Sequence, residues 1–99
     1  MRDDENAAAL NGLTRMAALF GRDALLPVVE GLRHELRQAL VMPGAADAHR
    51  IAGLAGTLGF AAASASWQAV DQGSEDRAAA LSESRTALTA INDWLQQKA

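Results

Sequence analysis

Large apolar residues recur every three or four positions along most of this chain, which is the spacing of amphipathic helices. One such stripe runs through Leu25, Val29, Leu32, Leu36 and Leu40. Glycine and proline interrupt the pattern at several points and divide the chain into five segments. The expected helices cover about residues 6–20, 23–40, 45–58, 60–72 and 74–97.

Short connections between amphipathic helices favour an antiparallel up-and-down four-helix bundle, with the first segment as an additional N-terminal helix. We expect Asp23 and Ser74 to be the N-cap residues of the second and last helices, since short polar side chains satisfy free backbone N–H groups there. All 99 residues fit one domain. Residues 1–5 are expected to be disordered.

The amino-acid composition agrees with an all-α fold. Alanine accounts for 23 residues and tyrosine is absent, whereas strands favour β-branched and aromatic side chains. The absence of cysteine excludes disulfides, thiolate zinc sites and a cysteine nucleophile. The net charge of −3 argues against bulk electrostatic binding to nucleic acid or anionic lipid.

Residues 51–70 contain no charge and are numerous enough to span a bilayer. Three glycines and several polar side chains interrupt this stretch, however, so we do not expect a membrane span. The acidic N-terminus lacks the basic start and apolar run of a signal peptide. A cytoplasmic protein is therefore expected.

The third segment contains the candidate chemistry. At about 100° per residue, Ile51, Leu54, Ala55 and Leu58 form a core face opposite His49, and small residues surround the histidine. These small residues are Ala45, Ala52, Gly53 and Gly56. Helical glycine is unfavourable by about 1 kcal/mol relative to alanine, so the pattern indicates space for a partner to approach a nucleophilic imidazole.

Other interpretations of these residues stay open. A lone helical histidine is usually a surface residue, and Gly53 and Gly56 also suit close packing of another helix. The second histidine, His34, shares a polar face with Glu30 and Arg37 and is expected on the surface. Trp67 and Trp94 recur at helical spacing with leucine and isoleucine and are expected in the core or a groove.

The stretch AHRIAGLAGTLGF resembles the signature of histidine-containing phosphotransfer (HPt) domains, with matches at His49, Ile51, Gly53, Leu58 and Gly59. The family has a four-helix bundle of about this length. The resemblance implies that His49 is the phosphorylated nucleophile. One departure is Ala52, because the family usually has a lysine there that is thought to balance the phosphoryl charge.

A replacement for that lysine has several candidates. Arg50 is adjacent in sequence but points about 100° away, and Arg33 and Arg37 lie on the polar side of the preceding helix. For Arg33 and Arg37, a plain solvated face is the competing interpretation. Gln68, or Gln72, on the following helix is a candidate for orienting the imidazole.

The resemblance implies a phosphorelay intermediate that takes a phosphoryl group from a receiver-domain aspartate onto His49 and passes it to another receiver. Gly53, Gly56 and Gly59 would then line the docking surface. The expected partners are response-regulator receiver domains, with a hybrid histidine kinase as a further candidate. Magnesium is expected on the receiver, and no cofactor on this chain.

The chain is expected to be a monomer that carries the phosphoryl group. ATP-dependent kinase activity is not expected, because no kinase-type nucleotide motif is present. Two alternatives remain. The first is an adaptor that binds a signalling partner through the same helical surface without carrying phosphate, which the absence of the lysine favours. The second is an unrelated alanine-rich bundle that dimerises through Gly53 and Gly56.

Overall fold

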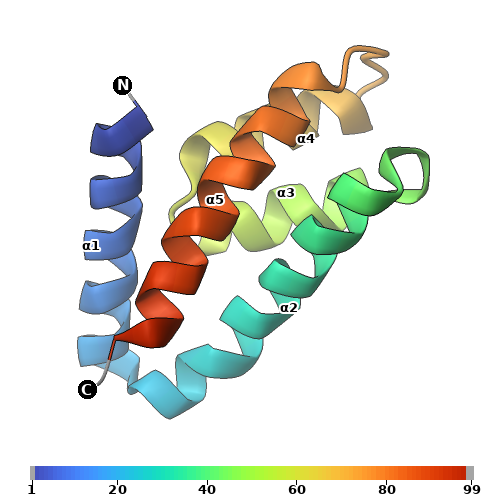
Figure 1. Ribbon diagram of the computed structural model, residues 1–99. Helices are drawn as coiled ribbons and strands as arrows, with labels where there is room; N and C mark the ends of the chain where they lie inside the picture. Colours follow the sequence, from blue (N-terminus) through green and yellow to red (C-terminus); the bar gives the residue numbers. More distant parts are fainter. Residues whose placement is uncertain (1, 98–99) are drawn as a thin grey trace.

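The apolar stripes fold into five α-helices and one short 3-10 helix (Figure 1). This computed structural model describes residues 2–97, and no strand occurs within that range. The elements are α1 (Arg2–Phe20), α2 (Arg22–Val41), η1 (Pro43–Ala45), α3 (Ala48–Thr57), α4 (Ala61–Asp71) and α5 (Ala78–Gln96). The all-α prediction is confirmed.

The first two helices begin earlier than the sequence pattern indicated. α1 starts at Arg2, so the backbone of residues 2–5 is helical where disorder was expected. Met1 lies outside the described residues. Gly21 separates α1 from α2 with a φ of 89°, a conformation that glycine adopts without strain. Gly21 is thus the N-cap residue of α2, and Asp23 lies inside the first turn rather than at the cap.

α3 and α5 begin later than expected, because side chains near their starts bind backbone N–H groups. The Oδ1 atom of Asp47 accepts a hydrogen bond from the Arg50 N–H at 3.0 Å and caps α3. Before α5, the Asp76 carboxylate accepts from the Ala78 N–H at 3.0 Å. The expected N-cap, Ser74, instead accepts from the Asp76 N–H at 3.3 Å, within the loop.

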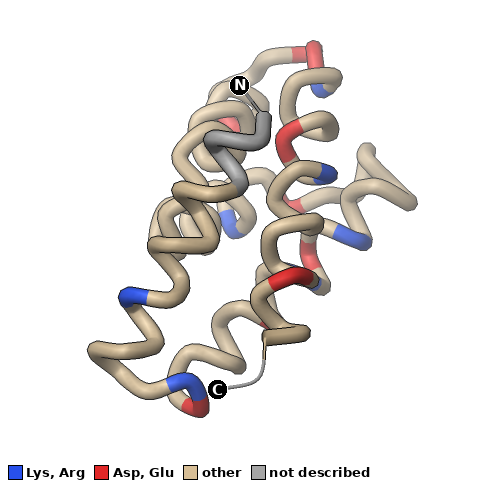
Figure 2. The backbone as a smooth tube through the Cα atoms, turned by 60° about the vertical axis from the view of Figure 1, so that its left-hand side comes forward, with Lys and Arg blue, Asp and Glu red and all other residues tan. Residues whose placement is uncertain are grey.

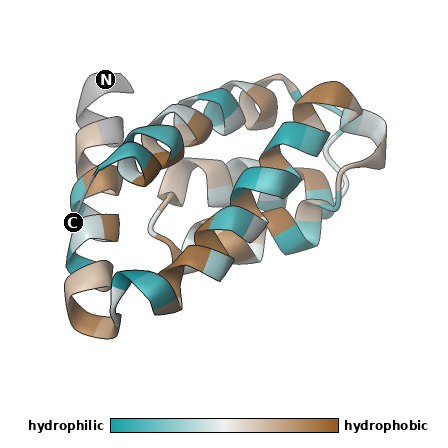
Figure 3. Ribbon diagram, turned by 60° about the horizontal axis from the view of Figure 1, so that its bottom comes forward, coloured by the Kyte–Doolittle hydropathy of each residue, from teal (hydrophilic) through white to brown (hydrophobic). Residues whose placement is uncertain are grey.

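The helices pack in a closed order. α3 lies against α4, α4 against α5, α5 against α2, and α2 against α3, while α1 packs on α5 and α2. Figure 3 shows hydrophobic and hydrophilic positions alternating along the helices, as burial of one face of each requires. An arginine from the α4–α5 loop fixes that loop against η1, since the Arg77 guanidinium donates to the Pro43 carbonyl.

Two tryptophans occupy the core, as expected, and are at most 1% exposed. The Trp67 indole N–H donates to the Ser84 hydroxyl at 2.9 Å, and that hydroxyl donates to the Ala80 carbonyl at 2.7 Å. Arg22 lies 4.2 Å from the centre of the Trp94 ring. Both polar groups of the buried Trp67–Ser84 pair therefore have partners, which fixes how α4 faces α5.

The uncharged stretch 51–70 does not form one long helix. Gly59, at a φ of 87°, ends α3 and allows the chain to reverse into α4. None of the helices within residues 2–97 has the length and apolarity needed to cross a membrane. In Figure 2, charged positions are scattered along the backbone, singly or in small groups, between long uncharged stretches.

Candidate functional site

His49 lies in the first turn of α3, and its side chain is 88% exposed. The Asp47 cap fixes this turn and leaves the imidazole free to point outward. On the opposite side of α3, Ile51, Ala55 and Leu58 are completely buried, and Leu54 is half-buried. The predicted core face of this segment is thus confirmed, as is the outward direction of His49.

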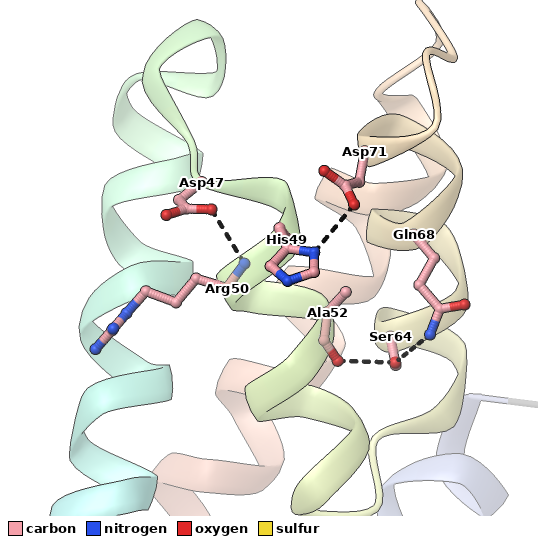
Figure 4. A network of polar contacts seen from close by, with 7 residues as sticks. All are labelled: Asp47, His49, Arg50, Ala52, Ser64, Gln68 and Asp71. Atoms are coloured by element: carbon pink, nitrogen blue, oxygen red, sulfur yellow. Dashed lines mark hydrogen bonds and ion pairs between the residues drawn. The ribbon is translucent and has the colours of Figure 1, made fainter.

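A carboxylate from the next helix faces the imidazole. The Nδ1 atom of His49 lies 3.2 Å from the Oδ2 atom of Asp71, the last residue of α4 (Figure 4). In the neutral ring, a proton on Nδ1 is donated to this carboxylate, and the Nε2 lone pair remains unprotonated. The arrangement favours one tautomer and leaves Nε2 as the nucleophilic atom.

Asp71 is not among the residues predicted from the sequence. A usable signal was the tight reversal at Gly59, because residues at similar distances before and after such a turn face each other across an antiparallel helix pair. His49 precedes this glycine by about three helical turns, and Asp71 follows it by a similar number. The sequence pattern indicates the amides of Gln68 and Gln72, rather than Asp71, as partners of the imidazole.

Gln68 has a different contact from the one expected. Its amide donates to the Ser64 hydroxyl at 3.2 Å, and that hydroxyl donates to the Ala52 carbonyl at 2.8 Å (Figure 4). These bonds tie α4 to the middle of α3. Gln72 is the exposed C-cap residue of α4. The carboxylate of Asp71, rather than either glutamine, is therefore the group that contacts His49.

Two small residues expected beside His49 do not form an open surface next to it. Ala45 is part of η1, because α3 begins only at Ala48. Ala52 is 6% exposed, since α4 covers this flank of α3 and hydrogen-bonds to the Ala52 carbonyl. The position of the family's lysine is therefore under α4 and not on an open surface.

The three glycines of the signature have three different environments. A Cβ atom added at Gly53 meets nothing within 4 Å, whereas one added at Gly56 lies 3.1 Å from the Ser64 hydroxyl oxygen. Gly56 thus lets α4 pack closely, which is the alternative considered for it. Gly59 supplies the left-handed turn, and Gly53 alone of the three leaves open space on the helical surface near His49.

The arginines proposed as replacement cations point away from the imidazole. The Arg50 guanidinium pairs with the Glu35 carboxylate at 2.9 Å and thereby links α3 to α2. Arg33 donates to the Asn92 side chain of α5 at 3.0 Å. Glu35 and Arg33 are about 200° apart around α2, so Arg33 lies on the flank of α2 that is remote from α3. Arg37 follows one turn later on that remote flank.

His34, the second histidine, is exposed on α2, as expected.

In comparisons with family models, curated proteins and solved structures, none matches this chain. The candidate site is therefore defined by its own geometry, which consists of an exposed imidazole, a carboxylate on one ring nitrogen and a side-chain-free position at Gly53.

Proposed function

We propose that this chain is a histidine phosphotransfer protein of a two-component phosphorelay, and that His49 carries the phosphoryl group. The observation that supports this most directly is the exposed imidazole whose Nδ1 atom lies 3.2 Å from the Asp71 carboxylate. The resemblance of AHRIAGLAGTLGF to the HPt signature supports the same function. In this proposal α2 to α5 form the antiparallel four-helix bundle and α1 is the additional N-terminal helix.

The proposed reaction begins with a neutral imidazole. The Nε2 lone pair of His49 attacks the phosphorus of an aspartyl phosphate on a receiver domain, so an N–P bond forms as the bond from phosphorus to the aspartate oxygen breaks. The receiver aspartate leaves as a free carboxylate. The imidazole ring gains positive charge and keeps its Nδ1 proton, which the Asp71 carboxylate accepts in a hydrogen bond and stabilises electrostatically.

The reverse sequence passes the phosphoryl group to a second receiver. The receiver supplies the magnesium ion and most of the catalytic groups in this proposal, and the present chain supplies the nucleophile and the open surface at Gly53. The chain acts as a carrier without ATP-dependent kinase activity. We place it in the cytoplasm as a monomer, where response regulators and a hybrid histidine kinase are the partners.

One observation favours a second function, an adaptor that binds a signalling partner without carrying phosphate. The lysine position of the signature is the buried Ala52, and the charged group that contacts His49 is an anion. A carboxylate near a phosphoryl group is repulsive, and the described side chains place no arginine or lysine against the imidazole. This charge arrangement suits docking through the helical surface better than retention of phosphate.

The deciding experiment incubates the chain with receiver domains carrying radiolabelled aspartyl phosphate and magnesium. Phosphohistidine is acid-labile and base-stable, and we expect such label on the chain, its loss in His49→Gln and its retention in His34→Gln. Label that persists in His49→Gln refutes the proposed site. Receiver binding that is unchanged in His49→Ala, without any transfer, identifies the adaptor function instead.

A further inference from the structure

The flank of α2 that is turned away from His49 combines arginine with half-buried leucine. Hollows run along the contact of α2 with α5, and their walls include Arg22, Leu26, Arg33, Arg37, Leu88 and Leu95. We call the surface that these six residues line the α2–α5 groove. The leucines are partly exposed, so apolar side chains are accessible from outside among the arginines.

The charge of this groove is opposite to that of the whole chain. Three arginines line it, and Glu30 is the acidic residue among the lining side chains, whereas the chain as a whole carries −3. Arg33 makes a neutral contact with Asn92. Among the side chains that the structure describes, Arg33 and Arg37 have no carboxylate partner.

One of the three arginines also has a structural role. The Arg22 guanidinium donates to the carbonyls of Trp94 and Leu95 at 3.2 Å each, and it lies against the Trp94 ring. These bonds hold the C-terminal end of α5 against the start of α2. Arg33 and Arg37, in contrast, are available to an external anion. They are one helical turn apart, which is about 6 Å along α2.

We propose that the α2–α5 groove binds an acidic amphipathic helix of a partner protein. A helix in a groove presents apolar residues to the floor and charged residues to the rim, and this groove offers leucines between arginines. Carboxylates spaced by one turn on the incoming helix match the spacing of Arg33 and Arg37. From Arg22 to Arg37, α2 rises about 22 Å, so a helix of about four turns spans the groove.

The partly exposed leucines favour such a helix over a polyanion. Nucleic acid is bound mainly by contacts between basic residues and phosphates, and the leucines would not contribute to those contacts. Val41, which continues the groove toward the end of α2, is 76% exposed. A partner with both leucine and glutamate side chains matches the leucines, the exposed Val41 and the arginines of this groove.

The test uses the full chain and a fluorescein-labelled peptide of about 18 residues. Leucines form one face of the peptide and glutamates flank them at i and i+4, and fluorescence anisotropy reports binding. We expect binding that weakens with salt and falls at least about tenfold in Arg37→Glu, because a charge pair becomes a repulsion. Arg15→Glu is the matched control, since Arg15 is an exposed residue of α1 and the charge change is identical.

The outcomes separate this proposal from its alternatives. Absence of binding at millimolar protein, equal losses in Arg15→Glu and Arg37→Glu, or equal binding of a peptide with glutamine in place of glutamate would each refute it. Duplex DNA that binds with the same dependence on Arg37 indicates a polyanion site instead. A dimer in sedimentation that Arg37→Glu dissociates indicates a second copy of this chain.

Separate controls test whether each variant folds and whether loss of phosphotransfer affects peptide binding. Arg37→Gln, which removes the charge without reversing it, is expected to weaken peptide binding about threefold or more, and thermal melts of each variant verify the fold. His49→Gln is expected to bind the peptide normally, because His49 lies beyond the opposite flank of α2. Loss of the phosphoryl carrier function therefore leaves this proposal intact, and the converse also holds.

Discussion

Replacing Gly53 and Gly56 by alanine tests whether the two glycines of α3 have the different environments described above. Both lie within the helix Ala48–Thr57. An added Cβ meets no atom within 4 Å at Gly53, but at Gly56 it lies 3.1 Å from the Ser64 hydroxyl oxygen. The same chemical change is thus made once into open space and once against α4.

The expected magnitudes follow from two opposing contributions. Alanine in place of a helical glycine stabilises by about 0.5–1 kcal/mol, and at Gly53 nothing opposes this gain. A gain of about 1 kcal/mol raises the Tm of a domain this size by about 4–8 °C. At Gly56, the Ser64 hydroxyl must shift, although it is bound to the Ala52 carbonyl at 2.8 Å. Loss of that bond costs about 0.5–1.5 kcal/mol, so the net gain vanishes or changes sign.

The assay is urea unfolding followed by circular dichroism, with the single variants and the pair Gly56→Ala/Ser64→Ala. In the Ser64→Ala background the hydroxyl is absent, so an alanine at position 56 no longer meets that oxygen. In that background, Gly56→Ala should raise the free energy of unfolding by at least half of the gain expected for a helical glycine. The internal comparison also corrects for the place of Gly56 near the helix end. Equal stabilisation at both glycines, or an effect of Gly56→Ala that is independent of Ser64, refutes the reasoning.

Two further substitutions probe polar contacts. Asp71→Asn should slow phosphoryl uptake by His49 about two- to fivefold, the range for an exposed ion pair worth up to about 1 kcal/mol. Initial rates from a labelled receiver measure this, and Asp93→Asn, an exposed charge elsewhere on the surface, should leave the rate unchanged. Ser84→Ala should lower the free energy of unfolding by about 1–3 kcal/mol, because the buried Trp67 indole loses its acceptor. Denaturant unfolding checks this, and Trp67→Phe in the same background should cost less than it does in the wild type.

The hydrophobic spacing was sufficient to predict the helices but not their starts. The five segments all exist, since each buries a stripe whose period is that of the helix. The late starts of α3 and α5 occur where a side chain or a proline competes for the backbone. Pro43–Ala45 forms a separate 3-10 helix, Asp47 caps α3, and Asp76 binds the Ala78 N–H. Several polar residues lie near each of these helix starts, and which of them caps the helix depends on the geometry of the preceding loop.

The candidate site was predictable where it depends on one helix alone. The outward direction of His49 follows from the buried residues on the opposite side of α3. The burial of Ala52 does not, because a helical wheel gives an angle and not the identity of the neighbour that covers it. The contact of His49 with Asp71 depends in turn on the α3–α4 reversal. Both of these errors thus reflect the same missing information, which is how α4 lies on α3.

The arrangement of charge around α2 bears on where a phosphorylated His49 would find its counter-charge. On one flank of α2, the Glu35 carboxylate pairs with the Arg50 guanidinium. On the other flank, Arg33 donates a hydrogen bond to the Asn92 side chain of α5. α2 therefore separates Arg33 and Arg37 from the imidazole.

The lysine position of the signature lies under α4, so a lysine introduced by Ala52→Lys would also have to extend past that helix to reach the site. Within the described side chains, the nearest charge to His49 is the anion of Asp71, which stabilises a charged ring but not a phosphoryl group. In the proposed reaction, the docking receiver and its magnesium must therefore supply the positive charge, and the transfer depends on the complex more than on the isolated chain.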